Sequence, residues 1–289
     1  MPPRANEAKI RGMLRAPPLG SLYNQLLLPT RTQFDPGDRI GVVLVSPRNP
    51  LNIGAAARAM ANFGISKLGV VAPYAPHWRE ARSAVGAPDL LSAAVESASL
   101  PEAVAGYTLV LGTGTLTHRK PEQPVVPLPE LAPLVRRELE RGGRVAVVFG
   151  PEKHGLTRED LSYCQVLVEI PTDPRQPSMN LGQAVAVCLY ELASRAFPVG
   201  VLDTGTAEAP RREADRVPAA PSGALDRLAS IVEETVLAAG YSPSSMQAAN
   251  RHDLRLLLRR LAPTERDTRR ILGLFRRILW RLNPNRKRD

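Results

Sequence analysis

Cysteine is scarce in this sequence, because only Cys164 and Cys188 occur among 289 residues. Both lie within apolar patterns, and neither belongs to a CxxC pair or has a histidine close by in the sequence. This spacing argues against a disulfide framework and against a cysteine-ligated zinc site. We therefore expect two buried, reduced thiols and no metal site.

Long hydrophobic runs are also lacking. The most apolar segment, residues 181–197, is interrupted by Gln183, Glu191 and Arg195, all of which are costly at the centre of a bilayer. The first twenty residues contain basic side chains but no continuous apolar run of the kind found in signal peptides. We expect no transmembrane helix, and we predict a cytoplasmic protein.

Acidic residues are rare at the C-terminal end of the chain. Residues 241–289 contain 13 basic and 4 acidic side chains, a balance of +9, whereas the formal charge of the whole chain is +10. The preceding 240 residues hold the remaining 25 basic and 24 acidic groups and are almost neutral. A tail polarised in this way suits a polyanion such as nucleic acid, and the alternative is a solvated basic helix face.

Short apolar runs alternate with helical patterns through the middle of the sequence. Five runs rich in Val, Ile and Leu are too short for helices and are typical of buried strands. The alternation predicts an α/β fold with a mainly parallel sheet that helices cover on both faces. The expected strands are Ile40–Val45, Leu68–Ala72, Leu109–Gly112, Val145–Phe149 and Val166–Ile170, and the expected helices are Asn52–Phe63, Pro88–Ser97, Pro129–Arg141 and Ser178–Ala196.

The segments on either side of this region differ from it. Residues 1–38 are rich in proline without periodicity, so we predict a mobile N-terminal arm before a domain formed by residues 39–197. Prolines among Gly, Ala and charged residues predict a linker over 198–222. Three amphipathic patterns then predict a small basic helical extension over 223–289.

Three segments carry polar residues and glycines that packing alone does not explain. The first extends from Asn49 to Arg58, directly after the first expected strand. Asn52 and Arg58 supply polar groups near the carboxyl end of that strand, where open α/β sheets bind ligands. The alternative is that Asn52 only caps a helix and that Arg58 is only a surface charge.

The second segment, residues 149–156, follows the fourth expected strand. Gly150 and Gly155 permit backbone geometries and close approaches that a side chain would block, so the backbone at Gly150 is expected to meet a ligand. Glu152 lies between the two glycines, and the alternative is that it is merely the acidic residue of a turn.

The third segment begins with Ile170 and Pro171 and continues through Ser178 and Asn180 into an expected helix. Ser178 or Asn180 would serve as a helix cap, which is a sufficient local explanation for either residue. Capping does not explain why all three segments occur in this order.

Together, the three segments resemble the signature motifs of the SPOUT superfamily of RNA methyltransferases, in its TrmH-like branch. The resemblance extends from about Ile40 to Ala196. It implies methylation of a ribose 2'-hydroxyl of RNA from S-adenosylmethionine, and a deep trefoil knot at the carboxyl end of the sheet. The pair Gly112 and Gly114 could instead suggest a dinucleotide site, but the third glycine of that fingerprint is missing.

The resemblance also implies a cofactor pocket built largely from backbone groups after the fourth and fifth strands. It implies a homodimer in which Arg58 of one subunit approaches the cofactor of the other, and isologous pairing is the expected symmetry. The residues expected at the cofactor are Thr113, Gly114, Thr115, Gly150, Ile170, Pro171, Pro177, Ser178 and Met179.

Catalytic roles follow from the same resemblance. Arg58, Asn52 and Ser178 are expected to frame the reacting oxygen, while Asn180 secures the third segment and Glu152 the second. Related enzymes are proposed to use the arginine as a base. A free guanidinium has a pKa of about 12.5, so a neutral arginine at pH 7 costs about 7.5 kcal/mol. A cationic arginine that stabilises the developing alkoxide is physically easier.

The basic helical extension after the catalytic segments resembles that of tRNA-directed members of this branch. This implies methylation of tRNA, with position 32 of the anticodon loop as the expected site. A ribosomal RNA methyltransferase of the same fold and a non-catalytic RNA-binding module are the alternatives. Tyr74, His77 and Trp78 could stack on bases, although a half-buried Trp78 is favoured. The expected RNA contacts are Arg119, Lys120, Arg255, Arg259, Arg270 and Arg277.

Overall fold

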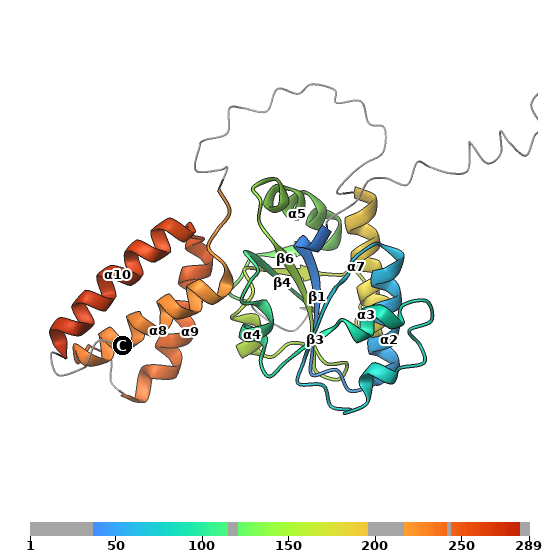
Figure 1. The fold of residues 1–289 in the computed structure, drawn as a ribbon, viewed down its shortest axis with the longest axis horizontal. Coiled ribbons are helices and arrows are strands. Elements are labelled where there is room, and N and C mark those ends of the chain that lie inside the picture. The colour runs from blue at the N-terminus through green and yellow to red at the C-terminus, as the bar shows by residue number, and fades with distance from the viewer. Residues whose placement is uncertain (1–36, 115–120, 196–216, 242–243, 284–289) are drawn as a thin grey trace, which may run out of the picture.

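A computed structural model describes residues 37–114, 121–195, 217–241 and 244–283. At its centre is a seven-stranded sheet in the order β3-β2-β1-β6-β4-β7-β5, with neighbouring strands parallel (Figure 1). The expected α/β fold with a mainly parallel sheet is confirmed. The strands are β1 (Ile40–Val45), β2 (Lys67–Val71), β3 (Val95–Ser97), β4 (Leu109–Thr113), β5 (Val125–Pro127), β6 (Val145–Phe149) and β7 (Val166–Glu169).

All five expected strands are present, but the two edge strands were not expected. The prediction of one helix over Pro88–Ser97 is wrong, because the helix there ends at Ser92 and the chain continues as β3. Val95 and Ser97 pair with β2, and this long-range pairing overrides the local helical pattern. β5 has only three residues and contacts one neighbour, β7.

Two layers of helices cover the sheet, and side chains alternate between them along each strand. In β1, Val42 and Leu44 pack in the cluster formed with α2, α3, α5 and α7, whereas Val43 and Val45 pack in the cluster with α4 and α6. Gly182 lets α7 approach α2 closely, because a Cβ there would lie 2.7 Å from the Cβ of Ala55. These helices are α2 (Pro50–Asn62), α3 (Pro88–Ser92), α4 (Leu100–Val104), α5 (Leu131–Glu140), α6 (Arg158–Leu161) and α7 (Leu181–Arg195).

Both cysteines are buried and free, as the sequence predicts. Burial raises the pKa of each thiol to about 12. Because the thiolate is the reactive form, we expect neither Cys164 nor Cys188 to react with a disulfide reagent such as dithionitrobenzoate in native protein at pH 8. Both are expected to react once the protein is unfolded in guanidinium. Rapid labelling of either thiol under native conditions would contradict this burial.

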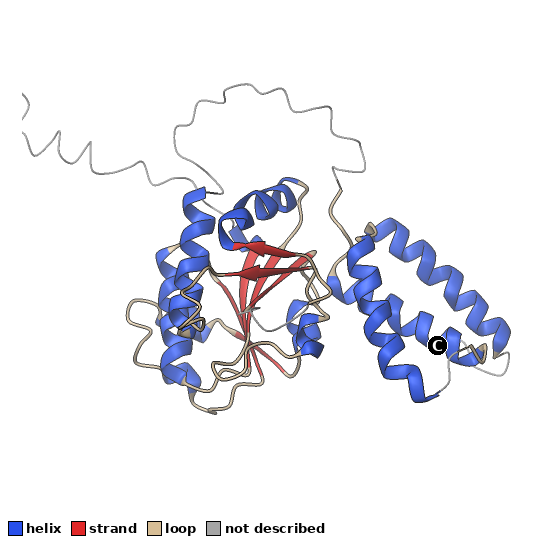
Figure 2. Ribbon diagram, turned by 180° about the vertical axis from the view of Figure 1, so that it is seen from behind, coloured by secondary structure: helices blue, strands red, loops and turns tan. Residues whose placement is uncertain are grey.

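The C-terminal helices form a separate layer beside the sheet (Figure 2). They are α8 (Ser222–Ala238), α9 (Gln247–Leu261) and α10 (Glu265–Leu282), so the expected helical extension is present. Most of the expected linker and N-terminal arm lies outside the described residues. The last linker residues are part of the fold, since Ala219 forms a bridge with Thr264 and Ala220 is fully buried. The amides of Ser222 and Gly223 donate to the carbonyls of Tyr107 and Ala105.

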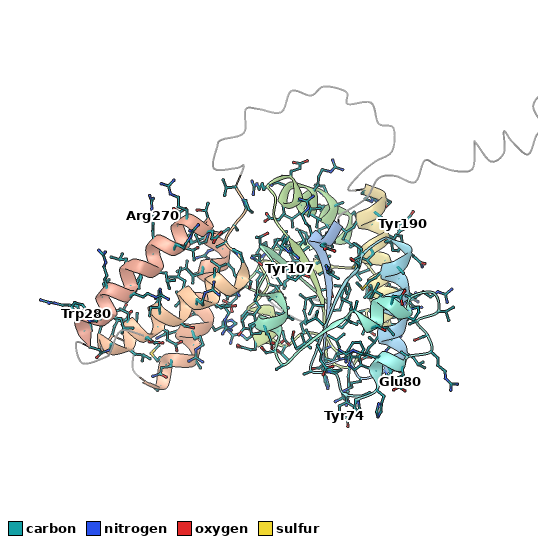
Figure 3. All side chains as sticks on the ribbon, in the orientation of Figure 1. Tyr74, Glu80, Tyr107, Tyr190, Arg270 and Trp280 are labelled. Carbon is teal, nitrogen blue, oxygen red and sulfur yellow. The ribbon has the colours of Figure 1, made fainter. Side chains whose placement is uncertain are left out.

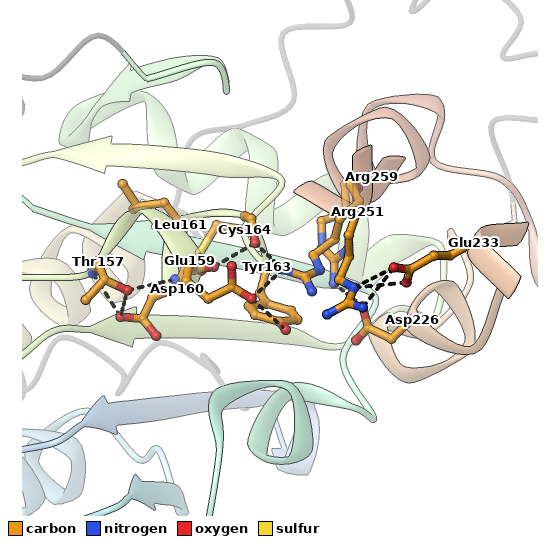
Figure 4. Close-up of polar contacts among 12 residues, drawn as sticks. Thr157, Glu159, Asp160, Leu161, Tyr163, Cys164, Asp226, Glu233, Arg251 and Arg259 are labelled. Carbon is orange, nitrogen blue, oxygen red and sulfur yellow. Dashed lines mark hydrogen bonds and ion pairs between the residues drawn. The ribbon is translucent and has the colours of Figure 1, made fainter. Parts of the chain in front are cut away.

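Two arginines of α9 are buried where the C-terminal helices meet the sheet and its covering helices. Arg255 is 7% exposed, donates to Glu159 at 2.7 Å and lies 4.2 Å from the centre of the Tyr163 ring. Arg259 is 3% exposed and pairs with Asp226 at 2.9 Å (Figure 4). Ion pairs and burial engage both side chains here, so the expectation that Arg255 and Arg259 contact RNA stays a prediction.

Candidate active site

A cavity of about 340 Å³ opens at the carboxyl ends of β4, β6 and β7, the edge at which parallel α/β sheets bind ligands. Two loops form most of its wall: residues 149–155 after β6, and residues 170–179 between β7 and α7. The remaining wall comes from the end of β4 and the first turn of α7. The lining residues are Thr113, Gly114, Phe149, Gly150, Pro151, Glu152, Lys153, His154, Gly155, Ile170, Thr172, Pro177, Ser178, Met179, Leu181 and Ala184.

Gly150 is the tightest point of the first loop. A Cβ built on it would lie 2.3 Å from the carbonyl carbon of Gly155 and 2.3 Å from the amide nitrogen of Leu156. Neither neighbour is a flexible side chain, so the loop itself would have to move to accommodate any other residue. Gly155 has a φ of +63°, a conformation that favours glycine. The loop therefore folds back on itself and presents backbone to the cavity.

A relay of hydrogen bonds joins the three sequence segments. The side-chain amide of Asn52 donates to Glu152 at 2.7 Å, and that of Asn180 donates to the Asn52 oxygen at 2.9 Å. The backbone amides of Arg48 and Asn49 also donate to Glu152, at 3.1 and 3.2 Å. One carboxylate and two side-chain amides thus hold the first segment to the second, 100 residues away, and to the third, 128 residues away.

The same relay decides between the alternatives for three residues. Asn49, not Asn52, accepts from the amide of Leu51 as the cap of α2. Both polar atoms of the Asn52 side chain are engaged, which favours a positioning role over contact with a reacting oxygen. Asn180 accepts from the amide of Gly182 at 3.0 Å and caps α7, so α7 begins after Asn180 rather than at Ser178 as expected.

The pKa of the Glu152 carboxyl lies below its ordinary value. Burial raises this pKa, but hydrogen bonds from the Asn52 side chain and from backbone amides outweigh that effect. Because the pKa is lower in the folded state, the ionised carboxylate stabilises the fold at pH values above the ordinary pKa of a carboxyl group. That contribution is lost as the pH falls through the folded-state pKa.

We expect Glu152→Gln to reduce the stability of the protein at pH 7 by about 0.5–1 kcal/mol, a small value because the carboxyl is partly exposed to solvent. In glutamine an NH2 group replaces one of the two acceptor oxygens, so a single oxygen faces the three N–H donors that contact Glu152. Urea unfolding at pH 7 and pH 4 measures the effect, and the difference between variant and native protein is expected to shrink at pH 4. An equal difference at both pH values would contradict the proposed hydrogen bonding.

Most residues expected at the cofactor line this cavity. Thr113, Gly114, Gly150, Ile170, Pro177, Ser178 and Met179 do so, whereas Pro171 does not and Thr115 lies outside the described residues. The sequence prediction missed seven lining residues: Phe149, Pro151, Lys153, His154, Thr172, Leu181 and Ala184. The first five lie within the segments that the sequence had identified, and the last two lie in the first turn of α7.

Arg58 is the expected catalytic residue that the chain does not bring to the cavity. It lies on α2, is exposed to solvent, and is not among the residues that line the cavity of its own chain. An exposed arginine on a helix next to the site is available to a second molecule. Tyr190, on the adjacent α7, is likewise 57% exposed (Figure 3).

Of the remaining expected RNA contacts, Arg270 (Figure 3) is exposed on α10, and Arg277 of the same helix is also exposed. Arg119 and Lys120 lie outside the described residues. Tyr74 is 77% exposed, with the guanidinium of Arg48 5.6 Å from the centre of its ring. Trp78 is fully buried and donates to Glu96, which excludes it from stacking on a base in this arrangement.

Two features are absent from the described residues, a cluster of metal ligands and a helix that could span a membrane. These residues contain no group of three or more His, Cys, Asp or Glu side chains arranged to hold a metal ion. Among the helices formed by these residues, none combines the length and apolar character needed to cross a membrane.

Comparison with known proteins finds one family and relatives that are named as RNA methyltransferases. The SpoU rRNA Methylase family matches residues 39–190. The tRNA (cytidine/uridine/adenosine-2'-O-)-methyltransferase TrmJ of Pseudomonas aeruginosa is 47% identical over 156 residues, which cover 54% of this chain and 60% of that protein. The tRNA (cytidine/uridine-2'-O-)-methyltransferase TrmJ of Pectobacterium atrosepticum is 32% identical over 82% of this chain and 95% of that protein.

Solved structures agree with the sequence matches. The crystal structure of TrmJ from Z. mobilis superposes with a TM-score of 0.69 at 28% identity and covers 82% of this chain and 98% of that one. A probable methylase family protein from Haemophilus influenzae superposes with a TM-score of 0.53 at 27% identity. Both matches cover more than four fifths of this chain, and so extend well beyond the residues of the family match.

Proposed function

The chain belongs to the SpoU rRNA methylase family, and from this premise we propose that it methylates a ribose 2'-hydroxyl of tRNA with S-adenosylmethionine as the methyl donor. The observation that carries the proposal is the cavity formed by a glycine-containing loop after β6 and a proline-rich loop after β7, and braced by Asn52, Glu152 and Asn180. The Pectobacterium relative, which is named for this activity on tRNA, matches 82% of the chain, including part of the helical extension.

The cavity fits the proposed cofactor in size and chemistry. Its volume of about 340 Å³ is in the range of small-ligand sites. Gly114, Gly150 and Met179 would hold the adenosine part largely through backbone groups, and Phe149, Ile170 and Leu181 supply apolar surface. When bound, S-adenosylmethionine supplies an electrophilic methyl group, and the chain itself needs no group that can carry a methyl.

We propose that two copies of the chain complete the site. Arg58 is exposed on α2 outside the cavity of its own chain, and Leu51 and Tyr190 add exposed apolar surface on α2 and α7. Pairing of this helical face with its equivalent would give an isologous dimer and carry Arg58 of the partner subunit toward the cavity.

In this proposal the chain acts by positioning and by electrostatics. Arg58 of the partner subunit stays cationic, orients the ribose hydroxyl and stabilises negative charge as it develops on that oxygen. Ser178 lies in the cavity wall and orients the same hydroxyl. Asn52, Glu152 and Asn180 hold the loops in register, and the proton leaves to solvent or to an RNA phosphate.

We also propose that the chain is threaded as a deep trefoil knot at this edge. The 149–155 and 170–179 loops, which the knot would bring together, line one cavity at this edge. In the same proposal residues 39–197 form the catalytic domain, and 223–289 form a basic extension whose Arg270 and Arg277 contact RNA. Position 32 of the anticodon loop remains the predicted site, and a cytoplasmic location remains a prediction.

Mapping ribose methylation in tRNA and ribosomal RNA from cells that lack the protein tests the substrate. We expect one ribose of the tRNA anticodon loop to lose its methyl group, and the native gene but not an Arg58→Ala variant to restore it. Loss of a methyl group from ribosomal RNA instead would establish the alternative substrate. Unchanged methylation in both RNA classes would favour a non-catalytic RNA-binding module.

A further inference from the structure

A second cavity, of about 510 Å³, lies where the C-terminal helices meet the sheet. Thr108, Pro124 and Val166 place it at the amino ends of β4, β5 and β7, whereas the cofactor cavity lies at the carboxyl ends. Strands of this length are roughly 15 Å long, so the two cavities are distinct. The site described above makes no use of this second cavity.

Arginines dominate the charged groups of this second cavity. Arg137 and Arg141 come from α5, and Arg259 and Arg260 from α9. Glu122 and Glu138 are the acidic residues in the wall, and both are engaged by neighbours. Glu122 pairs with Arg158 at 3.0 Å, and Glu138 accepts from the hydroxyl of Thr108 at 2.5 Å. The balance of the wall is therefore positive.

Arg259, whose polar contacts are drawn in Figure 4, is a buried charged residue of the cavity wall. Its side chain is only 2% exposed, and its terminal nitrogens donate to Ser222, Asp226 and the carbonyl of Arg255. In the described part of the chain, its buried Nε has no hydrogen-bond acceptor. A buried guanidinium N–H without an acceptor is costly, and an anionic oxygen is the ligand atom that satisfies it best.

We propose that this cavity binds a phosphate group of the RNA substrate, with Arg137 and Arg260 at its exposed mouth. This inference rests on the proposed function, because it takes RNA to be the substrate. Arginine binds phosphate oxygens through paired N–H donors, and the volume leaves room for an attached sugar. A strand of RNA that enters the active site would then be held at both ends of the sheet.

The double variant Arg137→Ala/Arg260→Ala tests the proposal, because both side chains are exposed and removing them leaves the core intact. Each phosphate contact contributes about 0.7–0.9 to the slope of log K against log salt concentration. We expect the slope for a tRNA transcript to fall by about 0.7–0.9, as for the loss of one phosphate contact, and the affinity at 150 mM salt to fall about tenfold. Arg227→Ala, an exposed arginine of α8 outside the cavity wall, is the matched control and is expected to leave the slope unchanged.

Two further measurements separate the possible outcomes. Titration calorimetry with cytidine monophosphate and with inorganic phosphate tests for a free ligand. The assignment to RNA would be overturned if the native protein bound either small ligand saturably and the double variant did not, while the variant bound tRNA as tightly as the native protein. Methyl transfer by the native protein is measured in the same preparation. If the native protein methylates tRNA but the double variant shows the same salt slope of tRNA binding, this inference alone is refuted. If the native protein does not methylate tRNA, the proposed function is refuted.

Discussion

Replacing Arg58 with alanine is expected to lower the rate of methyl transfer by about 100- to 1000-fold, the range typical for loss of one group that stabilises charge in the transition state. Cofactor affinity is expected to remain within about twofold, because Arg58 does not line the cavity of its own chain. The fold is expected to be unaffected, since the side chain is exposed. Single-turnover kinetics with saturating tRNA, together with calorimetry for S-adenosylmethionine, measure both effects.

A mixed dimer separates action across the subunit interface from action within one chain. Arg58→Ala and Gly150→Ala chains carrying different tags are co-expressed, and the heterodimer is isolated by two affinity steps. One of its two sites then combines an intact cavity with an intact Arg58, so about half of native activity is expected. A heterodimer as inactive as either parent would show that Arg58 acts within its own chain.

Gly150→Ala is expected to weaken binding of S-adenosylmethionine by at least about 100-fold, because displacements near 1 Å in a positioned site have effects of this size. The added Cβ would lie 2.3 Å from backbone atoms of Gly155 and Leu156, so the loop that forms the cavity wall has to move. Calorimetry measures the affinity, and thermal unfolding shows whether the fold is retained.

Gly106→Ala is the matched control for this substitution. Gly106 has no positive φ, and a Cβ built on it meets no atom within 4 Å. Its replacement is expected to leave cofactor affinity and activity unchanged. If Gly150→Ala binds the cofactor as tightly as Gly106→Ala does, the loop after β6 is not the cofactor site.

The sequence predicts the centre of the sheet better than its edges. β1 and β6 are unbroken apolar runs buried on both faces, a pattern that local sequence states clearly. β3 and β5 have three residues each and exist because of pairing with β2 and β7. Such pairing is a tertiary effect, so periodicity within a short window does not reveal it.

The candidate site shows the same division. Gly150 and Asn180 were identifiable because the backbone geometry and the cap they provide depend on residue type. The buried arginines of α9 were not, because Arg255 is paired with Glu159 and Arg259 with Asp226, residues that are distant in sequence. A count of charges treats these arginines as surface groups, whereas in the structure they are buried where the C-terminal helices pack against the sheet domain. Arg58 lies outside the cavity of its own chain, and in the proposed dimer the partner subunit supplies it.

Methyl transfer in vitro tests the central claim most directly. The purified protein is incubated with an unmodified tRNA transcript and S-adenosylmethionine labelled in its methyl group, and the RNA is then digested to nucleosides and analysed by mass spectrometry. We predict that the label is recovered in one 2'-O-methylated nucleoside, and that a parallel ribonuclease digest to oligonucleotides places it in the anticodon loop. Label on a base, or none on RNA from a protein that binds the cofactor, would contradict the account.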